Sequence, residues 1–373
     1  MRLIPVWALR PGMEVAKKVG YGTNAPLLNA GVKLQMEYIQ QLKKLNIRAI
    51  YVHDALIPDV EIEDVILEQT REKAVNLVRT ALTGLKEDSA SNFKLLMTAK
   101  EKLSDVLDDI VSQLLSNKNL TVNLSDIRHT DDYTFTHSVN VAVLSITTAI
   151  SLGMNKAQLK SIGMGAFLHD LGKVVVPVSI LNKPDFLTVD EMAEMKKHPL
   201  YGLELIRARN IFNGPAASII YKHHERINGS GYPQGLKRDD IELSPKICAI
   251  ADVYDALVSD RPYRPGFMPH RAMEIIDRES EAFDLQILQT FYHHIPAYPI
   301  GTFVGLNNGY IGVVVSNTHG HPTRPRVRVL CRKDDLGPLE FFEVDLLSTL
   351  NLVVDRVYED HEIPGYIYYR GLN

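Results

Sequence analysis

The chain has 373 residues, of which 45% are hydrophobic and 23% charged, and its formal net charge at pH 7 is −4. This length predicts two or three domains, and the composition is typical of a globular protein in water. The negative charge argues against binding to bulk nucleic acid. A phosphate-bearing ligand would therefore have to be held by metal ions and by local basic residues.

The chain has only two cysteines, Cys248 and Cys331, and they lie far apart in the sequence. A disulfide framework or a thiolate zinc site is therefore not indicated, and a reducing cytoplasm is favoured. The N-terminus lacks the apolar core of a secretory signal. The least polar stretch, residues 139–154, is shorter than the roughly 20 residues that span a bilayer. We expect a cytoplasmic protein without a membrane span.

Residues 1–57 form the first segment, in which glycine and proline break up short apolar runs, for example at Gly20-Tyr21-Gly22. This punctuation is typical of strands and turns. Residues 36–45 have a helical pattern, and residues 49–52 are predicted to form a strand. We interpret the segment as a small mixed α/β accessory domain whose signal the sequence does not identify.

Residues 58–124 form a second, charged segment in which leucine and valine recur at helical spacing. A break at Thr83-Gly84 indicates two helices joined by a turn. We interpret this pair as a connector, and a homodimer through these helices is one further possibility. The sequence names no protein signalling partner.

Residues 125–295 are predicted to fold as consecutive helices without a parallel sheet. Asn155 with Gln158, and Thr188 with Glu191, have the spacing of reciprocal helix N-caps. Such caps mark where two of these helices begin.

Residues 296–373 change character, because glycines become frequent and residues 326–329 alternate arginine with valine. This pattern predicts short β-strands. The predicted fold is therefore mainly α: a helical bundle flanked by a small N-terminal mixed domain and a small C-terminal β-rich segment.

Histidines and aspartates recur through the helical segment at intervals of about one helix plus a turn. They are His137, His169, Asp170, His198, His223, His224 and Asp252. Helices in a bundle can point such residues at one centre. His169 follows Ile162 and Ala166 at helical spacing, which predicts that it lies on the inward face of their helix. A single buried histidine is usually a satisfied core residue, but five histidines with two aspartates are poorly explained in that way.

Imidazole nitrogens and carboxylate oxygens without thiolates suit iron, manganese, nickel or zinc. Seven ligands exceed what one ion usually takes, and a carboxylate can bridge two ions. We therefore expect two metal ions roughly 3.5–4 Å apart, the arrangement used in phosphoester hydrolysis.

Three motifs carry a resemblance to a known family. His169-Asp170 with Lys173 resembles the His-Asp motif of the HD superfamily of metal-dependent phosphohydrolases. The run from His223 to Pro233, His-His-Glu-Arg-Ile-Asn-Gly-Ser-Gly-Tyr-Pro, is similar to the hallmark of its HD-GYP branch. Residues 251–257 and Arg-Pro-Tyr-Arg at 261–264 are similar to the branch's downstream signature. On these motifs residues 130–295 are identified as an HD-GYP domain, and an HD-type bundle is implied.

The resemblance implies a phosphodiesterase of bacterial second-messenger signalling that opens cyclic di-GMP to linear pGpG, with further hydrolysis to GMP left open. The metal ligands it implies are His137, His169, Asp170, His198, His223, His224 and Asp252, with Asp170 as the bridge. Lys173 corresponds to the family's active-site lysine, and Asp170 and Lys173 are the implied catalytic pair. The implied substrate contacts are Gly231, Tyr232, Arg261 and Arg264. Of the candidate metals, iron is favoured.

The residue four positions before the first histidine decides how many metals are expected. Some members of the family have a glutamate there and hold a third ion, whereas this chain has Tyr133. Tyrosine is a poor ligand at this position, so we expect two ions. Asp131 and Asp132 lie nearby and keep a third site open.

The expected chemistry is attack of water on an anionic phosphodiester. Two metals would lower the pKa of a bridging water and so yield hydroxide near neutral pH. Lys173 would stabilise the developing charge or assist the leaving alkoxide. Arg261 and Arg264 would hold the second phosphate, and Tyr232 would stack on a guanine or form a hydrogen bond near it. Taken alone, the two arginines could instead form a surface patch or pair with Asp255 and Asp260.

Two alternatives to this function stay open. The first is another phosphohydrolase of the wider HD superfamily, against which the Gly-Tyr-Pro loop argues. The second is a receptor that binds cyclic di-GMP without hydrolysing it, against which the intact set of ligands argues.

Overall fold

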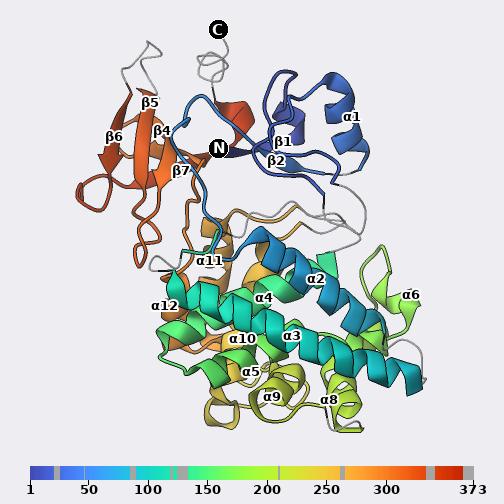
Figure 1. Ribbon diagram of the computed structural model, residues 1–373. Coiled ribbons are helices and arrows are strands. Elements are labelled where there is room, and N and C mark those ends of the chain that lie inside the picture. Colours follow the sequence, from blue (N-terminus) through green and yellow to red (C-terminus); the bar gives the residue numbers. More distant parts are fainter. Residues whose placement is uncertain are drawn as a thin grey trace.

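The computed structural model describes residues 1–20, 26–45, 47–84, 90–117, 121–123, 133–208, 211–260, 265–332 and 341–363, without the side chains of residues 90–97 and 133. A helical bundle forms one end of the molecule, and two small β-containing units lie side by side at the other end (Figure 1). The predicted mainly α fold with β-rich flanks is confirmed.

In the described part of the N-terminal unit, an α-helix and a short 3-10 helix (Val6–Ala8) accompany a two-stranded sheet. Strand β1 (Arg2–Pro5) pairs antiparallel with β2 (Ala49–Val52). Helix α1 (Met36–Lys44) buries Ile39 and Leu42 in the hydrophobic core of this unit. The helix and the strand predicted for this segment are both confirmed.

Two long helices, α2 (Glu68–Thr83) and α3 (Ala90–Ser116), follow, as the break at Thr83-Gly84 predicts. Their buried apolar residues belong to the same hydrophobic core as helices from the following segment. The apolar spacing is therefore already satisfied within one chain. A homodimer through residues 58–124 stays a prediction, and so does the division into four domains.

The bundle continues with consecutive helices, as predicted. They are α4 (Tyr133–Ser151), α5 (Lys156–Phe167), the 3-10 helix η3 (Leu171–Val174), α6 (Val178–Leu181), α7 (Val189–Met195), α8 (His198–Ala208), α9 (Gly214–Lys222), α10 (Leu243–Val258), α11 (Pro269–Arg278) and α12 (Leu285–Tyr292). Reciprocal hydrogen bonds cap α5 at Asn155 and α7 at Thr188, so both predicted caps are confirmed. Within the described ranges no helix combines the length and apolar character needed to cross a bilayer.

The C-terminal unit is a five-stranded antiparallel sheet. Its strands are β3 (Phe303–Leu306), β4 (Tyr310–Ser316), β5 (Arg326–Arg332), β6 (Phe342–Asp345) and β7 (Val354–Tyr358), in the order β6-β5-β4-β3-β7. Leu56, Ile57 and Val60 pack on one face of the sheet, next to the N-terminal unit. Arg2 is buried between Asp54 and Asp360 and so links the N-terminal unit to the segment after β7.

Candidate metal centre

The structure brings all seven predicted ligands together in the bundle, although they come from five different places in the chain. His137 lies on α4 and Asp252 on α10. His198 is the first residue of α8. The others lie at the ends of helices: His169 and Asp170 between α5 and η3, and His223 and His224 after α9. Their ligand atoms form two compact groups, in each of which the atoms lie within 4.8 Å of one another.

The local setting predicted for His169 was wrong. Helix α5 ends at Phe167, so His169 lies in the turn that follows instead of on the helix face. The ring is nevertheless buried. Its Nδ1 lies 2.8 Å from the carbonyl oxygen of Ala166, which is in the last turn of α5. The turn also points Asp170 to the same side.

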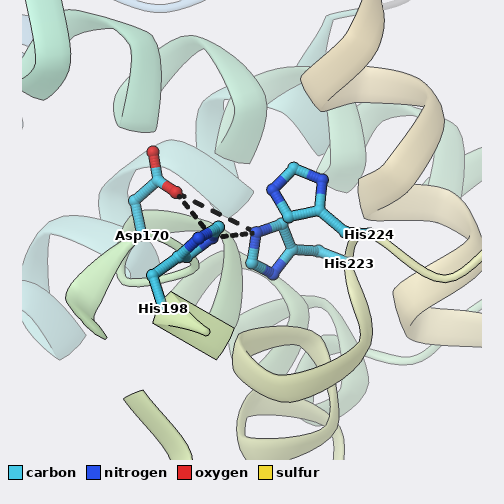
Figure 2. A group of neighbouring side chains, drawn as sticks. All are labelled: Asp170, His198, His223 and His224. Carbon is cyan, nitrogen blue, oxygen red and sulfur yellow. Dashed lines mark hydrogen bonds and ion pairs between the residues drawn. The ribbon is translucent and has the colours of Figure 1, made fainter. Parts of the chain in front are cut away.

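The first group consists of Asp170, His198, His223 and His224, which Figure 2 shows converging from separate segments. The Nε2 atoms of His198 and His223 are 3.3 Å apart. They lie 3.4 and 3.9 Å from Oδ1 of Asp170. One carboxylate oxygen and two imidazole nitrogens therefore surround one point.

The second group consists of His137, His169 and Asp252. Oδ1 of Asp252 lies 3.1 Å from Nε2 of His137 and 3.8 Å from Nε2 of His169. Nε2 of His169 is also 3.4 Å from Oδ2 of Asp170. The two oxygens of Asp170 therefore face different groups, which is the geometry that a bridging carboxylate requires.

Each buried imidazole is held in place through its other ring nitrogen. Nδ1 lies 2.8 Å from the carbonyl of Met195 in His198 and 3.0 Å from that of Ile219 in His223. In His137 it lies 2.7 Å from Oδ2 of Asp255. A hydrogen bond from Nδ1–H leaves Nε2 as an electron-pair donor toward the centre, as in metal-binding histidines generally.

Two atoms of the centre are buried without a hydrogen-bond partner in the part of the chain that the structure describes: Nε2 of His169 and Oδ1 of Asp170. An unsatisfied buried polar atom costs about 1–3 kcal/mol. A metal ion would satisfy both atoms, and a set of imidazoles and carboxylates suits divalent transition metals. The residues therefore fit divalent metal ions.

Burial sets the protonation of most of the histidines. It lowers the pKa of His198 to about 4 and holds the pKa values of His223 and His224 well below their usual range. Burial also acts to lower the pKa of His137, but hydrogen bonds to two aspartates outweigh it and raise that pKa to about 9. Neutral imidazole is the form that binds metals. The raised pKa of His137 implies that binding of an ion there would be accompanied by release of a proton.

The two carboxylates stay ionised despite their burial. Burial acts to raise the pKa of Asp170, but the nearby charge of Lys173 and the contacts with the surrounding histidines hold that pKa well below its usual range. For Asp252 the hydrogen bond from His137 has the same effect. Nζ of Lys173 lies 2.6 Å from Oδ2 of Asp170, and its half-buried side chain reaches the edge of the centre.

Gly172 explains how the turn at Asp170 can approach α8. A Cβ atom at this position would lie 1.8 Å from the carbonyl oxygen of His198 and 2.5 Å from the backbone nitrogen of Gly202. The close approach of η3 to α8, and with it the distance from Asp170 to His198, therefore requires glycine here.

The predicted substrate-contacting loop lies beside the first group. The ring of Tyr232 stacks on His224 with centroids 4.6 Å apart. Gly231 has a packing reason of its own, since a Cβ there would lie 2.4 Å from the backbone nitrogen of Arg226. The sequence had given no function to Glu225. It is buried, and its carboxylate accepts hydrogen bonds from the backbone N–H groups of Gln234 (2.8 Å) and Leu236 (2.9 Å).

Asp255 is the second residue that the sequence missed. It is fully buried and accepts hydrogen bonds from Asn140 and Ser259 besides its contact with His137. The alternative that Asp255 pairs with the downstream arginines stays a prediction. Arg261 and Arg264 lie outside the described residues, as do Asp131, Asp132 and the side chain of Tyr133.

Comparison with known proteins places this centre in a family. A family model described as "HD domain" matches residues 103–287, and one described as "KOW domain associated with HD domain" matches residues 303–365. The first range holds all seven predicted ligands, and the second corresponds to the C-terminal sheet.

Two curated relatives are named as phosphodiesterases. A cyclic di-GMP phosphodiesterase of Pseudomonas aeruginosa is 30% identical over 379 residues, which cover 93% of this chain and 89% of the relative. A cyclic di-GMP phosphodiesterase response regulator of Xanthomonas campestris is 33% identical over 211 residues, covering 56% of this chain and 55% of the relative.

A solved structure of an HDG"Y"P protein from Bdellovibrio bacteriovorus aligns with a TM-score of 0.46 at 20% identity, over 78% of this chain and 97% of that one. The near-complete match to the Pseudomonas relative and the HD-domain match define the relationship by themselves. The chain belongs to the HD-GYP family of metal-dependent phosphodiesterases.

Proposed function

We propose that this protein hydrolyses cyclic di-GMP to linear pGpG at a centre of two divalent metal ions, as part of bacterial second-messenger signalling. The names of the two curated relatives support the substrate. The observation that carries the proposal is the position of Asp170, whose two oxygens face two separate groups of ligand atoms beside Lys173 and Tyr232. Release of GMP during turnover would show that hydrolysis continues beyond pGpG.

The proposal gives each set of residues one task. Bound metal ions would supply Lewis-acid activation of water and neutralise phosphate charge. Lys173, on the open edge of the centre, would hold a proton for the leaving alkoxide or stabilise the developing negative charge. Tyr232 would lie against one guanine, with Gly231 giving its loop the necessary turn. Arg261 and Arg264 would hold the second phosphate through bidentate contacts.

The proposed ligands are His137, His169 and Asp252 for one ion and His198, His223 and His224 for the other, with Asp170 shared. Nitrogen and oxygen donors without sulfur are compatible with iron, manganese, nickel and zinc. Among these we favour iron.

We retain the four-part organisation as a proposal: an accessory unit at 1–57, a helical connector at 58–124, the catalytic unit at 125–295 and a β-rich unit at 296–373. The start of the KOW match at residue 303 supports the last boundary. Two buried cysteines without a disulfide support action in a reducing cytoplasm.

The test is metal analysis combined with turnover of cyclic di-GMP by anaerobically purified protein, with 3′3′-cGAMP and mononucleotides as comparison substrates. We expect two ions per chain and chromatographic release of pGpG. Preferential hydrolysis of mononucleotides would replace the proposal with a nucleotidase of the wider HD superfamily. Tight binding of cyclic di-GMP without product, in metal-replete protein, would replace it with a receptor.

A further inference from the structure

A line of buried hydrogen bonds runs from α2 to the metal centre. Nη1 of Arg71 on α2 donates to Oδ1 of Asn140 on α4 over 3.0 Å. Nδ2 of Asn140 donates to Oδ1 of Asp255 on α10 over 2.9 Å. Oδ2 of Asp255 then lies 2.7 Å from Nδ1 of His137. All four side chains are buried, so these contacts are shielded from water.

The chemistry of the groups gives this line a single direction. A guanidinium can only donate hydrogen bonds, and an ionised carboxylate can only accept them. The amide of Asn140 lies between the two, so its oxygen must face Arg71 and its nitrogen must face Asp255. Asp255 is then held as an acceptor for Nδ1–H of His137, and this leaves Nε2 of His137 as the atom that faces Asp252.

The other anchored histidines of the centre do not depend on such a line. Nδ1 of His169, His198 and His223 lies against a backbone carbonyl three or four residues earlier in the chain. Their orientation is fixed by the local backbone. The orientation of His137 depends on the relative positions of three helices, α2, α4 and α10.

We propose that Arg71, Asn140 and Asp255 form a positioning relay that fixes His137 as a ligand. The relay makes occupancy of the His137, His169 and Asp252 group depend on how α2 packs against α4. Since α2 is the first helix after the N-terminal unit, a shift of that unit would reach the centre through Arg71. The inference rests on the proposed function only in taking this group as a metal site.

The test replaces Arg71, which contacts none of the proposed ligands, with methionine of similar length. Metal content and chelator competition are measured anaerobically with iron(II) and with manganese(II). Changes to groups that orient metal ligands typically cost about 10–100-fold in affinity. We expect Arg71→Met to lose affinity by that factor for one of the two ions while the other stays bound. Arg71→Lys, which retains a donor, should recover part of the affinity.

The matched control is Arg79→Met on the same helix. The guanidinium of Arg79 lies over the ring of Phe135 on α4, 5.4 Å from its centroid, so it also joins α2 to α4. Arg79→Met should bind both ions as wild type does. If Arg71→Met and Arg79→Met lose the same unfolding free energy in urea and both keep wild-type affinity for two ions, the line is only structural and the relay is refuted.

A second variant covers the case in which Arg71→Met does not fold. Asp255→Asn has the same shape but offers an amide to His137, and it should lose at least as much affinity for one ion. Normal affinity in that variant refutes the relay. Because the readout is metal binding, wild-type protein that binds two ions without hydrolysing cyclic di-GMP would overturn the proposed function alone. Wild-type protein with the His137 group empty under saturating metal would overturn the relay.

Discussion

Two regions of the metal centre hold their histidines by different means. Between α5 and α9, Nδ1 of His169, His198 and His223 contacts a backbone carbonyl oxygen three or four residues earlier in the chain. Between α4 and α10, Nδ1 of His137 contacts Oδ2 of Asp255, which lies 118 residues away in the sequence. A local anchor forms wherever the helix end forms, whereas a remote anchor requires the bundle to be assembled. The first region is therefore set by the turns, and the second by helix packing.

The difference predicts which region responds to distant changes. The α5–α9 histidines should stay oriented as long as their helix ends persist. His137 should respond to anything that moves α2, α4 or α10 relative to one another. Asp170 faces both regions and should be the residue on which both depend.

The largest effect is expected for Asp170→Ala, which removes that shared carboxylate. Loss of a single electrostatic contact in an active site already costs about 100–1,000-fold in kcat. We therefore expect turnover to fall at least about 1,000-fold and metal content to drop in both groups. Anaerobic turnover assays with metal analysis check this. Full activity with normal metal content would refute the bridging position of Asp170 and with it the idea that the regions share a ligand.

The next effect concerns the substrate side of the centre. Arg261→Ala should remove a charge-assisted contact to a phosphate, worth about 1.5–3 kcal/mol. That energy corresponds to roughly a 10- to 100-fold rise in KM, while kcat and the metal content of both regions stay near wild type. Steady-state kinetics separates the two constants. A collapsed kcat at unchanged KM would instead place Arg261 in the chemical step.

Gly172→Ala tests the local region by moving its backbone. The new Cβ would meet the carbonyl oxygen of His198, which cannot rotate away. We expect the unfolding free energy to fall by about 3 kcal/mol, the upper end of the usual cost of overpacking, and metal affinity to fall with it. Urea unfolding and chelator competition measure the two effects.

Gly202→Ala is the matched control in the same contact. There the Cβ would meet chiefly the Cγ2 atom of Ile220, at 2.8 Å, which a side chain can relieve by rotating. The losses of unfolding free energy and of metal affinity should be smaller for Gly202→Ala than for Gly172→Ala. Equal losses would mean that the approach of η3 to α8 does not control the position of His198.

The convergence of the seven proposed ligands was predictable from the sequence because it follows from residue types and their spacing. The seven histidines and aspartates recur at intervals of about one helix plus a turn, and a Gly-Tyr-Pro loop follows one pair of them. These features of the sequence already predict a single centre. The caps at Asn155 and Thr188 were predictable for the same reason, since reciprocal capping depends on residues only three positions apart.

The residues that support the ligands were harder to predict from the sequence, because tertiary packing determines which residues they contact. Asp255 follows Asp252 by one helical turn, so its spacing placed it on the same face, but only the position of α4 brings it to His137. No spacing rule connects Arg71 to Asn140, which is 69 residues later. The setting of His169 was wrong because helical periodicity does not reveal where a helix ends.

The smallest effect is expected at Glu225. Its hydrogen-bond partners are farther away in the sequence than those of the local histidines but much closer than the partner of His137. Its carboxylate reaches two backbone N–H groups, of Gln234 and Leu236, nine and eleven residues away in the loop that holds Tyr232. Glu225→Gln keeps the shape but presents an amide N–H₂ to one of these donors. We expect KM for cyclic di-GMP to rise by roughly 3- to 10-fold, equivalent to about 1 kcal/mol.

Metal content separates this effect from a general loss of structure. Because Glu225 orders the loop and not the ligands, Glu225→Gln should bind both ions as wild type does. Asp239→Asn, which changes an exposed carboxylate in the 3-10 helix η4 (Arg238–Asp240) that follows the loop, should leave KM unchanged. If Glu225→Gln loses an ion at unchanged KM, Glu225 supports the metal-binding histidines instead of the substrate-contacting loop and belongs to the metal centre.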